Sequence, residues 1–228
     1  MANGEPNLFQ FLQRFYTTPA ALEMQPVLVL DTSAVIDLDQ AYQKRYGLRR
    51  ATQFLDHLKD TATNLRILIP PMIKDEIASH RDYSIGGRPE ISPQTLERVL
   101  QYQSRDTAVQ EFITQQKDRI DRARYCLRLL YPQVCNGKKG ERDPISRQDW
   151  AVVYLAISLG VFSEDRLAKN KKVDLPNLLQ GCYTTAVLTS DYHVYALLDR
   201  VFEEPEGVEL THFLKPVNVR AYTINGTR

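Results

Sequence analysis

Short aliphatic runs alternate along the chain with stretches in which apolar residues recur three or four positions apart. Residues 27–30 and the segment LRILIP, residues 65–70, predict two strands, and residues 40–60 between them have helical spacing. A strand, a helix and a second strand in this order form a βαβ unit, which favours a parallel sheet covered by helices. Pro71 suits a first helical turn and places Glu76 early in the helix that follows.

Further helices are predicted by their capping residues. Ser92 and Pro93 fit the N-cap and first position of a helix that continues to about residue 130. Ser146 and Asp149 fit the N-cap and N3 positions of another helix, and Gly160 is a stop signal past its end. The later segments TTAVLTSD, YHVYALLDRV and GVELTHF predict a strand, a helix and a last strand.

These elements predict an α/β fold with a mainly parallel central sheet and a long helical insertion. The expected divisions are an N-terminal extension over 1–25, a domain over 26–220 with insertions at about 84–145 and 163–182, and a tail over 221–228.

Composition is that of a globular chain, with 43% hydrophobic and 25% charged residues. No run approaches the length of a membrane span, so we expect a cytoplasmic protein with no membrane partner. The net charge of +1 means that contacts to nucleic acid would have to come from local basic segments. The candidate segments lie shortly before the helix that contains Asp149 and before the strand that ends at Asp191. Their basic residues are Lys138, Lys139, Arg142, Lys171 and Lys172.

Four acids occupy equivalent places in this layout. Asp31 and Asp191 each follow a strand, whereas Glu76 and Asp149 lie early in helices. In an open parallel sheet, strand ends and the starts of the following helices share one edge, so the four carboxylates should converge. Each also has a structural explanation, as an N-cap, a capping-box partner or a residue favoured by the helix dipole.

A convergent set of carboxylates would need a cation. Like charges in one crevice raise each other's pKa unless a counterion neutralises them. Hard divalent ions, Mg²⁺ or Mn²⁺, suit an all-oxygen set of ligands. Such a cluster suits hydrolysis of phosphodiester bonds.

The segments LVLDTSAVID, IPPMIKDEI, SRQDWAVVYLAISLG and AVLTSD resemble the four successive motifs of PIN-domain nucleases, which include bacterial toxins and RNA-processing enzymes. The resemblance spans about 27–214. It implies a PIN-like αβα sandwich and a ribonuclease that acts on RNA, expected to be single-stranded. By the resemblance, the residues that hold Mg²⁺ or Mn²⁺ are Asp31, Glu76, Asp149 and Asp191. Those that orient the acids or waters are Thr32, Ser33 and Ser190.

The chain departs from the family pattern in two places. Family members often carry an acid two residues after the last aspartate, where this chain has His193. The insertion between Glu76 and Asp149 is far longer than in compact toxin-type members, so the resemblance leaves open whether the chain is a toxin, and the insertion is a candidate surface for restricting substrate access or binding a partner. The candidate partners are an antitoxin, another protein or a second copy of the chain. Three further acids, Asp37, Asp75 and Asp143, are expected on solvated surfaces rather than among the ligands.

Two other functions remain open at this stage. One is a PIN-like module that has lost catalysis and binds RNA or protein. The other is a phosphatase of the haloacid-dehalogenase type, which also places an aspartate after its first strand but needs a second one at the position of Ser33.

Overall fold

The computed structural model describes residues 25–46, 54–56, 65–80, 84–85, 88–89, 91–101, 125, 145–169, 183–201 and 217–218. Its strands are β1 (Gln25–Leu30), β2 (Arg66–Leu68), β3 (Ser84–Ile85), β4 (Arg88–Pro89), β5 (Tyr183–Thr189) and β6 (Val217–Asn218). Its helices are α3 (Thr32–Tyr46), α5 (Pro71–Ser79), α6 (Pro93–Gln101), α10 (Arg147–Lys169) and α12 (Tyr192–Val201).

The centre of the fold is an open parallel sheet with the strand order β2-β1-β5-β6. β1 pairs with β5 along its whole length, from Gln25 opposite Tyr183 to Leu30 opposite Leu188. Residues 26–30 of β1 are buried, which explains why this strand is a continuous apolar run rather than an alternating one. The predicted α/β class with a parallel sheet is therefore confirmed.

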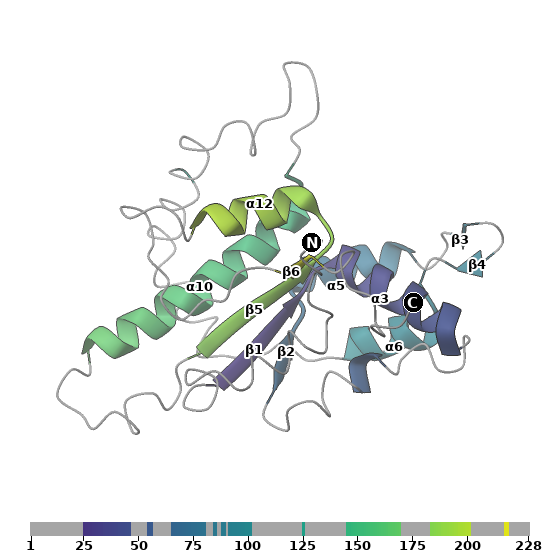
Figure 1. Cartoon of the computed structure of the whole chain (residues 1–228), viewed down its shortest axis with the longest axis horizontal. Helices are drawn as coiled ribbons and strands as arrows, with labels where there is room; N and C mark the ends of the chain where they lie inside the picture. The colour runs from purple at the N-terminus through teal and green to yellow at the C-terminus, as the bar shows by residue number, and fades with distance from the viewer. Residues whose placement is uncertain are drawn as a thin grey trace, which may run out of the picture.

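Helices enclose this sheet (Figure 1). α10 packs on β5 and β1, and α12 packs on α10 and β5. α3, α5 and α6 form a second group, in which α5 contacts both of the other helices. This arrangement is compatible with an αβα sandwich. None of the described helices combines the length and apolar character needed to cross a membrane.

Several predicted starts of elements are confirmed in detail. Pro71 is the first residue of α5, whose N-cap is Pro70. The backbone carbonyl of Ser92 accepts the Leu96 N–H at 3.0 Å, and its hydroxyl accepts the Thr95 N–H at 3.3 Å, so Ser92 is the N-cap of α6.

Other boundaries differ from the prediction. The first helix starts at Thr32, directly after Asp31, rather than at residue 40. Gly160 does not end α10, which continues to Lys169, so the predicted insertion at 163–182 begins inside that helix. Gly160 is buried, and packing of the helix body outweighs a glycine cost of about 1 kcal/mol.

Some predicted elements fall outside the described residues. Of the helix expected from Pro93 to about residue 130, the structure describes α6 and the helical residue Tyr125. The last strand expected at 207–213 lies outside the described residues, and β6 follows it in the chain as the neighbour of β5. The N-terminal extension to residue 24 and the C-terminal tail also lie outside them.

Candidate functional site

The four predicted acids lie at the carboxyl edge of the sheet and at the helices beside it. Asp31 and Asp191 follow the adjacent parallel strands β1 and β5, and the Asp31 N–H donates to the Leu188 carbonyl at 3.1 Å. Asp149 lies in the first turn of α10. Glu76 lies on α5, the helix after β2, as predicted; it is the sixth residue of that helix, beyond the first turn, so the alternative explanation that the helix dipole favours it does not apply.

Asp31 is buried in a shell of hydrogen-bond donors. Its side chain is 2% exposed. Its Oδ1 accepts the Thr32 backbone N–H at 2.7 Å, and its Oδ2 accepts the hydroxyls of Ser33 at 2.6 Å and Thr189 at 2.7 Å. The Asp31 carbonyl also accepts the Val35 N–H at 3.1 Å, so this residue is the N-cap of α3.

Thr32 joins Asp31 to Glu76. Its backbone N–H points at the Asp31 carboxylate, and its side-chain hydroxyl donates to Glu76 Oε2 at 2.6 Å. One residue therefore fixes the relative position of two acids that are 45 positions apart in the chain. The prediction that Thr32 orients neighbouring acids agrees with these contacts.

Ser33 and Thr189 join Asp31 to the end of β5. Ser33 Oγ accepts the Ser190 N–H at 2.9 Å, and Thr189 Oγ1 accepts the Asp191 N–H at 3.0 Å. Each hydroxyl has one proton, which it donates to Asp31 Oδ2, so the 3.5 Å contact between the two hydroxyl oxygens is not a further hydrogen bond. The two strand ends are thus held together by polar contacts through one carboxylate oxygen.

Asp149 forms the predicted capping box with Ser146. Its Oδ2 accepts the Ser146 N–H at 2.7 Å, and the Ser146 hydroxyl accepts the Asp149 N–H at 3.1 Å. The Ser146 carbonyl accepts the Trp150 N–H at 3.1 Å, which starts the α10 ladder. One carboxylate oxygen of Asp149 is therefore committed to the helix end.

Asp191 is the N-cap of α12. Its Oδ1 accepts the His193 N–H at 2.6 Å and the Val194 N–H at 3.2 Å, and its carbonyl accepts the Tyr195 N–H at 3.0 Å. His193, which stands where the family carries an acid, has a buried Nδ1 without a hydrogen-bond partner among the described residues.

The electrostatics show that the four acids share one region. Burial raises the pKa of Asp31 from 3.8 to about 6; hydrogen bonds from Ser33 and Thr189 oppose this rise, and the charge of Asp149 adds to it. Burial also raises the pKa of Asp149, against its contacts with Ser146, and the charges of Asp191 and Glu76 raise it further. Negative charge is therefore costly at this edge.

The carboxylates are near one another, but they do not converge on one point. Within the ranges that the structure describes, no three aspartate, glutamate, histidine or cysteine side chains form a group that could hold a metal ion. The contacts explain this, because oxygens of Asp31, Asp149 and Asp191 face donors of their own helix starts. Holding a metal would require some of these oxygens to turn towards the ion.

Two of the acids expected on solvated surfaces, Asp37 and Asp75, lie in the described residues, and Asp37 has a partner that the sequence did not indicate. Asp37, expected on a solvated surface, accepts a hydrogen bond from the hydroxyl of Ser190, which is 4% exposed. This contact ties α3 to the end of β5, so Asp37 lies on a helix as predicted but is only partly exposed to solvent. Asp75 is exposed on α5 as expected.

Asp39 is fully buried and ties α3 to the start of α6. Its carboxylate accepts the Ser92 N–H at 2.7 Å, the Ser92 hydroxyl at 2.8 Å, the Thr95 hydroxyl at 2.6 Å and Gln43 Nε2 at 2.6 Å. The N-cap signal at Ser92 indicated a helix start but carried no sign of this distant partner. Thr189, likewise unassigned, lies inside the quoted segment AVLTSD and is fully buried.

The predicted nucleic-acid contacts Lys138, Lys139, Arg142, Lys171 and Lys172 lie outside the described residues, as does Asp143. No protein-family model matches the chain, and neither a curated protein nor a solved structure matches it. The resemblance to PIN-domain nucleases therefore stays a prediction carried by the four motifs.

Proposed function

We propose that the chain is a metal-dependent ribonuclease of the PIN type, with Asp31, Glu76, Asp149 and Asp191 as the residues that hold Mg²⁺ or Mn²⁺. The observation that carries this proposal is that Asp31 and Asp149 lie buried at one edge of the sheet with raised pKa values, to which the charge of Asp149 contributes at Asp31 and the charges of Asp191 and Glu76 contribute at Asp149. A fold selected for stability alone gains nothing from this repulsion, whereas a bound divalent cation would reverse it.

The donor set fits such an ion chemically. Carboxylate oxygens are the ligands that Mg²⁺ and Mn²⁺ prefer, and these ions keep several waters, so they do not need an all-protein cage. When bound, the ion would polarise the phosphodiester and lower the pKa of a water that attacks it. The side chains of Asp149 and Asp191 each have a second oxygen beyond the one that accepts the capping hydrogen bonds.

The surrounding residues would hold the acids in place. Ser33 and Thr189 supply the protons that keep Asp31 Oδ2 oriented, and Thr32 does the same for Glu76 Oε2. The hydroxyls of Ser33 and Thr189 also accept the backbone N–H groups of Ser190 and Asp191, so the Asp31 carboxylate is positioned before substrate arrives. The Ser190 hydroxyl donates a hydrogen bond to Asp37 and so connects the same edge of the sheet to α3.

A second candidate is a PIN-like module that binds RNA or protein without cleaving it. The capping geometry favours it, because Asp149 and Asp191 both satisfy helix starts as ordinary structural residues. The two candidates differ in whether a metal ion and its carboxylates are needed for chemistry.

The deciding experiment follows end-labelled single-stranded RNA incubated with purified protein in Mn²⁺, Mg²⁺ or EDTA. We expect cleavage with either metal, none in EDTA, and loss of cleavage in Asp31→Asn and Glu76→Gln. Asp75→Asn is the matched control, because Asp75 precedes Glu76 on the same helix but is exposed. Undiminished cleavage in EDTA, or in both site variants, would refute the ribonuclease proposal; RNA binding with no cleavage in any metal would support the binding module.

A further inference from the structure

An exposed aromatic ring stands directly beside the acidic edge. Tyr192 is the first residue of α12 and is 68% exposed, whereas the neighbouring residues Ser190 and Val194 are buried. Tyrosine rings are usually at least half buried in folded proteins, because most of their surface is apolar. A ring left in water at this position is therefore available to a ligand.

The ring is held in place relative to Asp191. Asp191 Oδ1 accepts the His193 N–H at 2.6 Å, which fixes the first turn of α12. The His193 ring lies edge-on to the Tyr192 ring, with centroids 5.8 Å apart and an interplanar angle of 72°. An edge contact of this kind orients the tyrosine without covering both of its faces.

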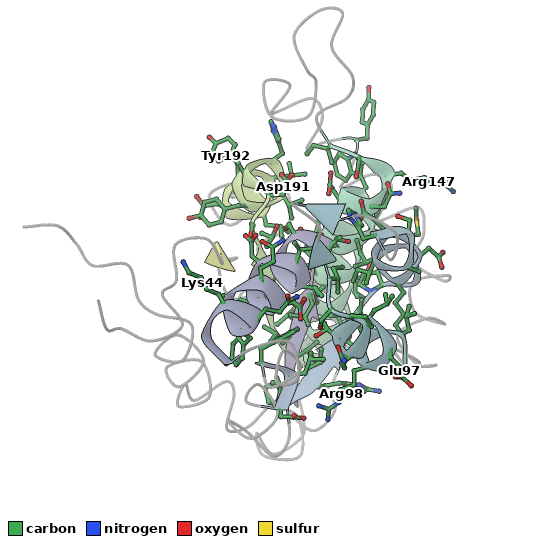
Figure 2. All side chains as sticks on the ribbon, turned by 90° about the vertical axis from the view of Figure 1, so that its right-hand side faces the viewer. Lys44, Glu97, Arg98, Arg147, Asp191 and Tyr192 are labelled. Carbon is green, nitrogen blue, oxygen red and sulfur yellow. The ribbon has the colours of Figure 1, made fainter. Side chains whose placement is uncertain are left out.

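A basic side chain accompanies a second acid of the site. Arg147 is the first residue of α10, it is exposed, and it lies two positions before Asp149. In Figure 2, which shows the molecule from the right-hand side of Figure 1, Asp191 lies between Tyr192 and Arg147. An aromatic face and a guanidinium on either side of an acidic edge match the two things that a single strand offers, a base and a phosphate.

We infer that Tyr192 is a stacking platform for one unpaired base of single-stranded RNA, and that Arg147 contacts a phosphate of the same strand. This inference rests on the proposed function, because it names the substrate form and two residues that position it. The bases of an RNA duplex are stacked on one another and cannot reach the ring, so the site would select single strands.

Stacking predicts a loss of affinity that does not depend on charge. Base–aromatic stacking weakens by about 5- to 150-fold on alanine substitution. Tyr192→Ala should therefore weaken binding of a fluorescein-labelled single-stranded RNA, measured by anisotropy in EDTA, while Tyr192→Phe keeps it. The slope of log affinity against log salt should stay the same in Tyr192→Ala and fall by about 0.7 in Arg147→Gln.

Oligonucleotides with one abasic nucleotide isolate the stacking contact. With the abasic site placed at successive positions, one position should weaken binding to wild type but not to Tyr192→Ala, because the lost base and the lost ring belong to one interaction. Tyr125→Ala is the matched control, since Tyr125 is also exposed, at 63%, and should bind like wild type.

The inference is overturned if Tyr192→Ala binds like wild type, if Tyr125→Ala weakens binding equally, or if no abasic position separates wild type from the variant. Equal affinity for duplex RNA also overturns it. Cleavage is measured separately in Mn²⁺ on the same proteins. If wild type cleaves RNA and Tyr192→Ala binds it as tightly as wild type, the stacking inference fails and the ribonuclease proposal stands. If binding depends on Tyr192 but wild type does not cleave, the ribonuclease proposal fails and the stacking inference stands.

Discussion

Removing the charge of Asp31 should change how stability depends on pH. The folded protein holds the Asp31 proton up to a pKa of about 6, against 3.8 for the ordinary carboxyl. Between these values the folded state binds more protons than the unfolded chain, so the free energy of unfolding falls as pH rises. Below the window both states are protonated and Asp31 contributes nothing; above it, the buried charge destabilises the fold in full.

The size of this effect follows from the two pKa values. At 1.36 kcal/mol per pKa unit, the gap between 3.8 and about 6 corresponds to about 3 kcal/mol. Asp31→Asn should remove this dependence while keeping the packing. The amide can donate to the Ser33 and Thr189 hydroxyl oxygens, each of which already accepts one backbone N–H and has a second lone pair.

The assay is urea unfolding of wild type and Asp31→Asn in EDTA at intervals from pH 4 to pH 7.5. The free energy of unfolding of Asp31→Asn minus that of wild type should rise by about 2 kcal/mol across this range, whatever the fixed cost of the amide, because pH 4 already lies above 3.8 and part of the full effect falls below the range. Asp149 is present in both proteins, so its own raised pKa largely cancels. Asp75→Asn, at an exposed position, should give a curve parallel to wild type.

The pH curves test the cost of the Asp31 charge, and added Mn²⁺ tests whether a metal ion offsets that cost. Parallel curves for wild type and Asp31→Asn would refute the assignment of a costly buried charge to Asp31. If the charge is costly and the site binds metal, millimolar Mn²⁺ should stabilise wild type more than Asp31→Asn, because only wild type keeps the full set of carboxylates.

Two further changes test the polar contacts. Asp39→Ala should lower the free energy of unfolding by about 3 kcal/mol or more in chemical denaturation, because the buried donors that contact Asp39 lose their acceptor. As a control, Asp56→Ala breaks the 2.6 Å ion pair with Arg98, whose side chain is 41% exposed, and should cost at most about 1 kcal/mol. A similar cost for both variants would argue against the buried role of Asp39. Thr189→Val should move the pH-dependent change in stability that Asp31 causes to higher pH, because the Thr189 hydroxyl lowers the pKa of the Asp31 carboxyl and the variant lacks it. An unchanged pH dependence would contradict the contact.

Much of the fold and part of the site could be predicted locally. The apolar runs predicted β1, β2 and β5, because strands buried on both faces are mostly apolar rather than alternating. Capping residues predicted the starts of α6, α10 and α12, since an N-cap bonds to N–H groups only two or three positions ahead, and Pro71 predicted the start of α5, since proline fits the first helical turn. The placement of the acids after strands and at helix starts follows from the same short-range patterns.

Contacts between distant segments were decided only by the tertiary structure. The buried shell of Asp31 includes Thr189, which comes from a strand 158 positions away, and Asp39 meets Ser92 across 53 positions. Gly160 reads locally as a helix stop, yet it is buried within α10. By itself, then, the sequence determined β1, β2 and β5, most helix starts and which residue types reach the edge of the sheet. Which hydroxyl meets which carboxylate, and how far burial raises a pKa, depended on the packed chain, because hydrogen-bond pairing and desolvation are properties of neighbours in space.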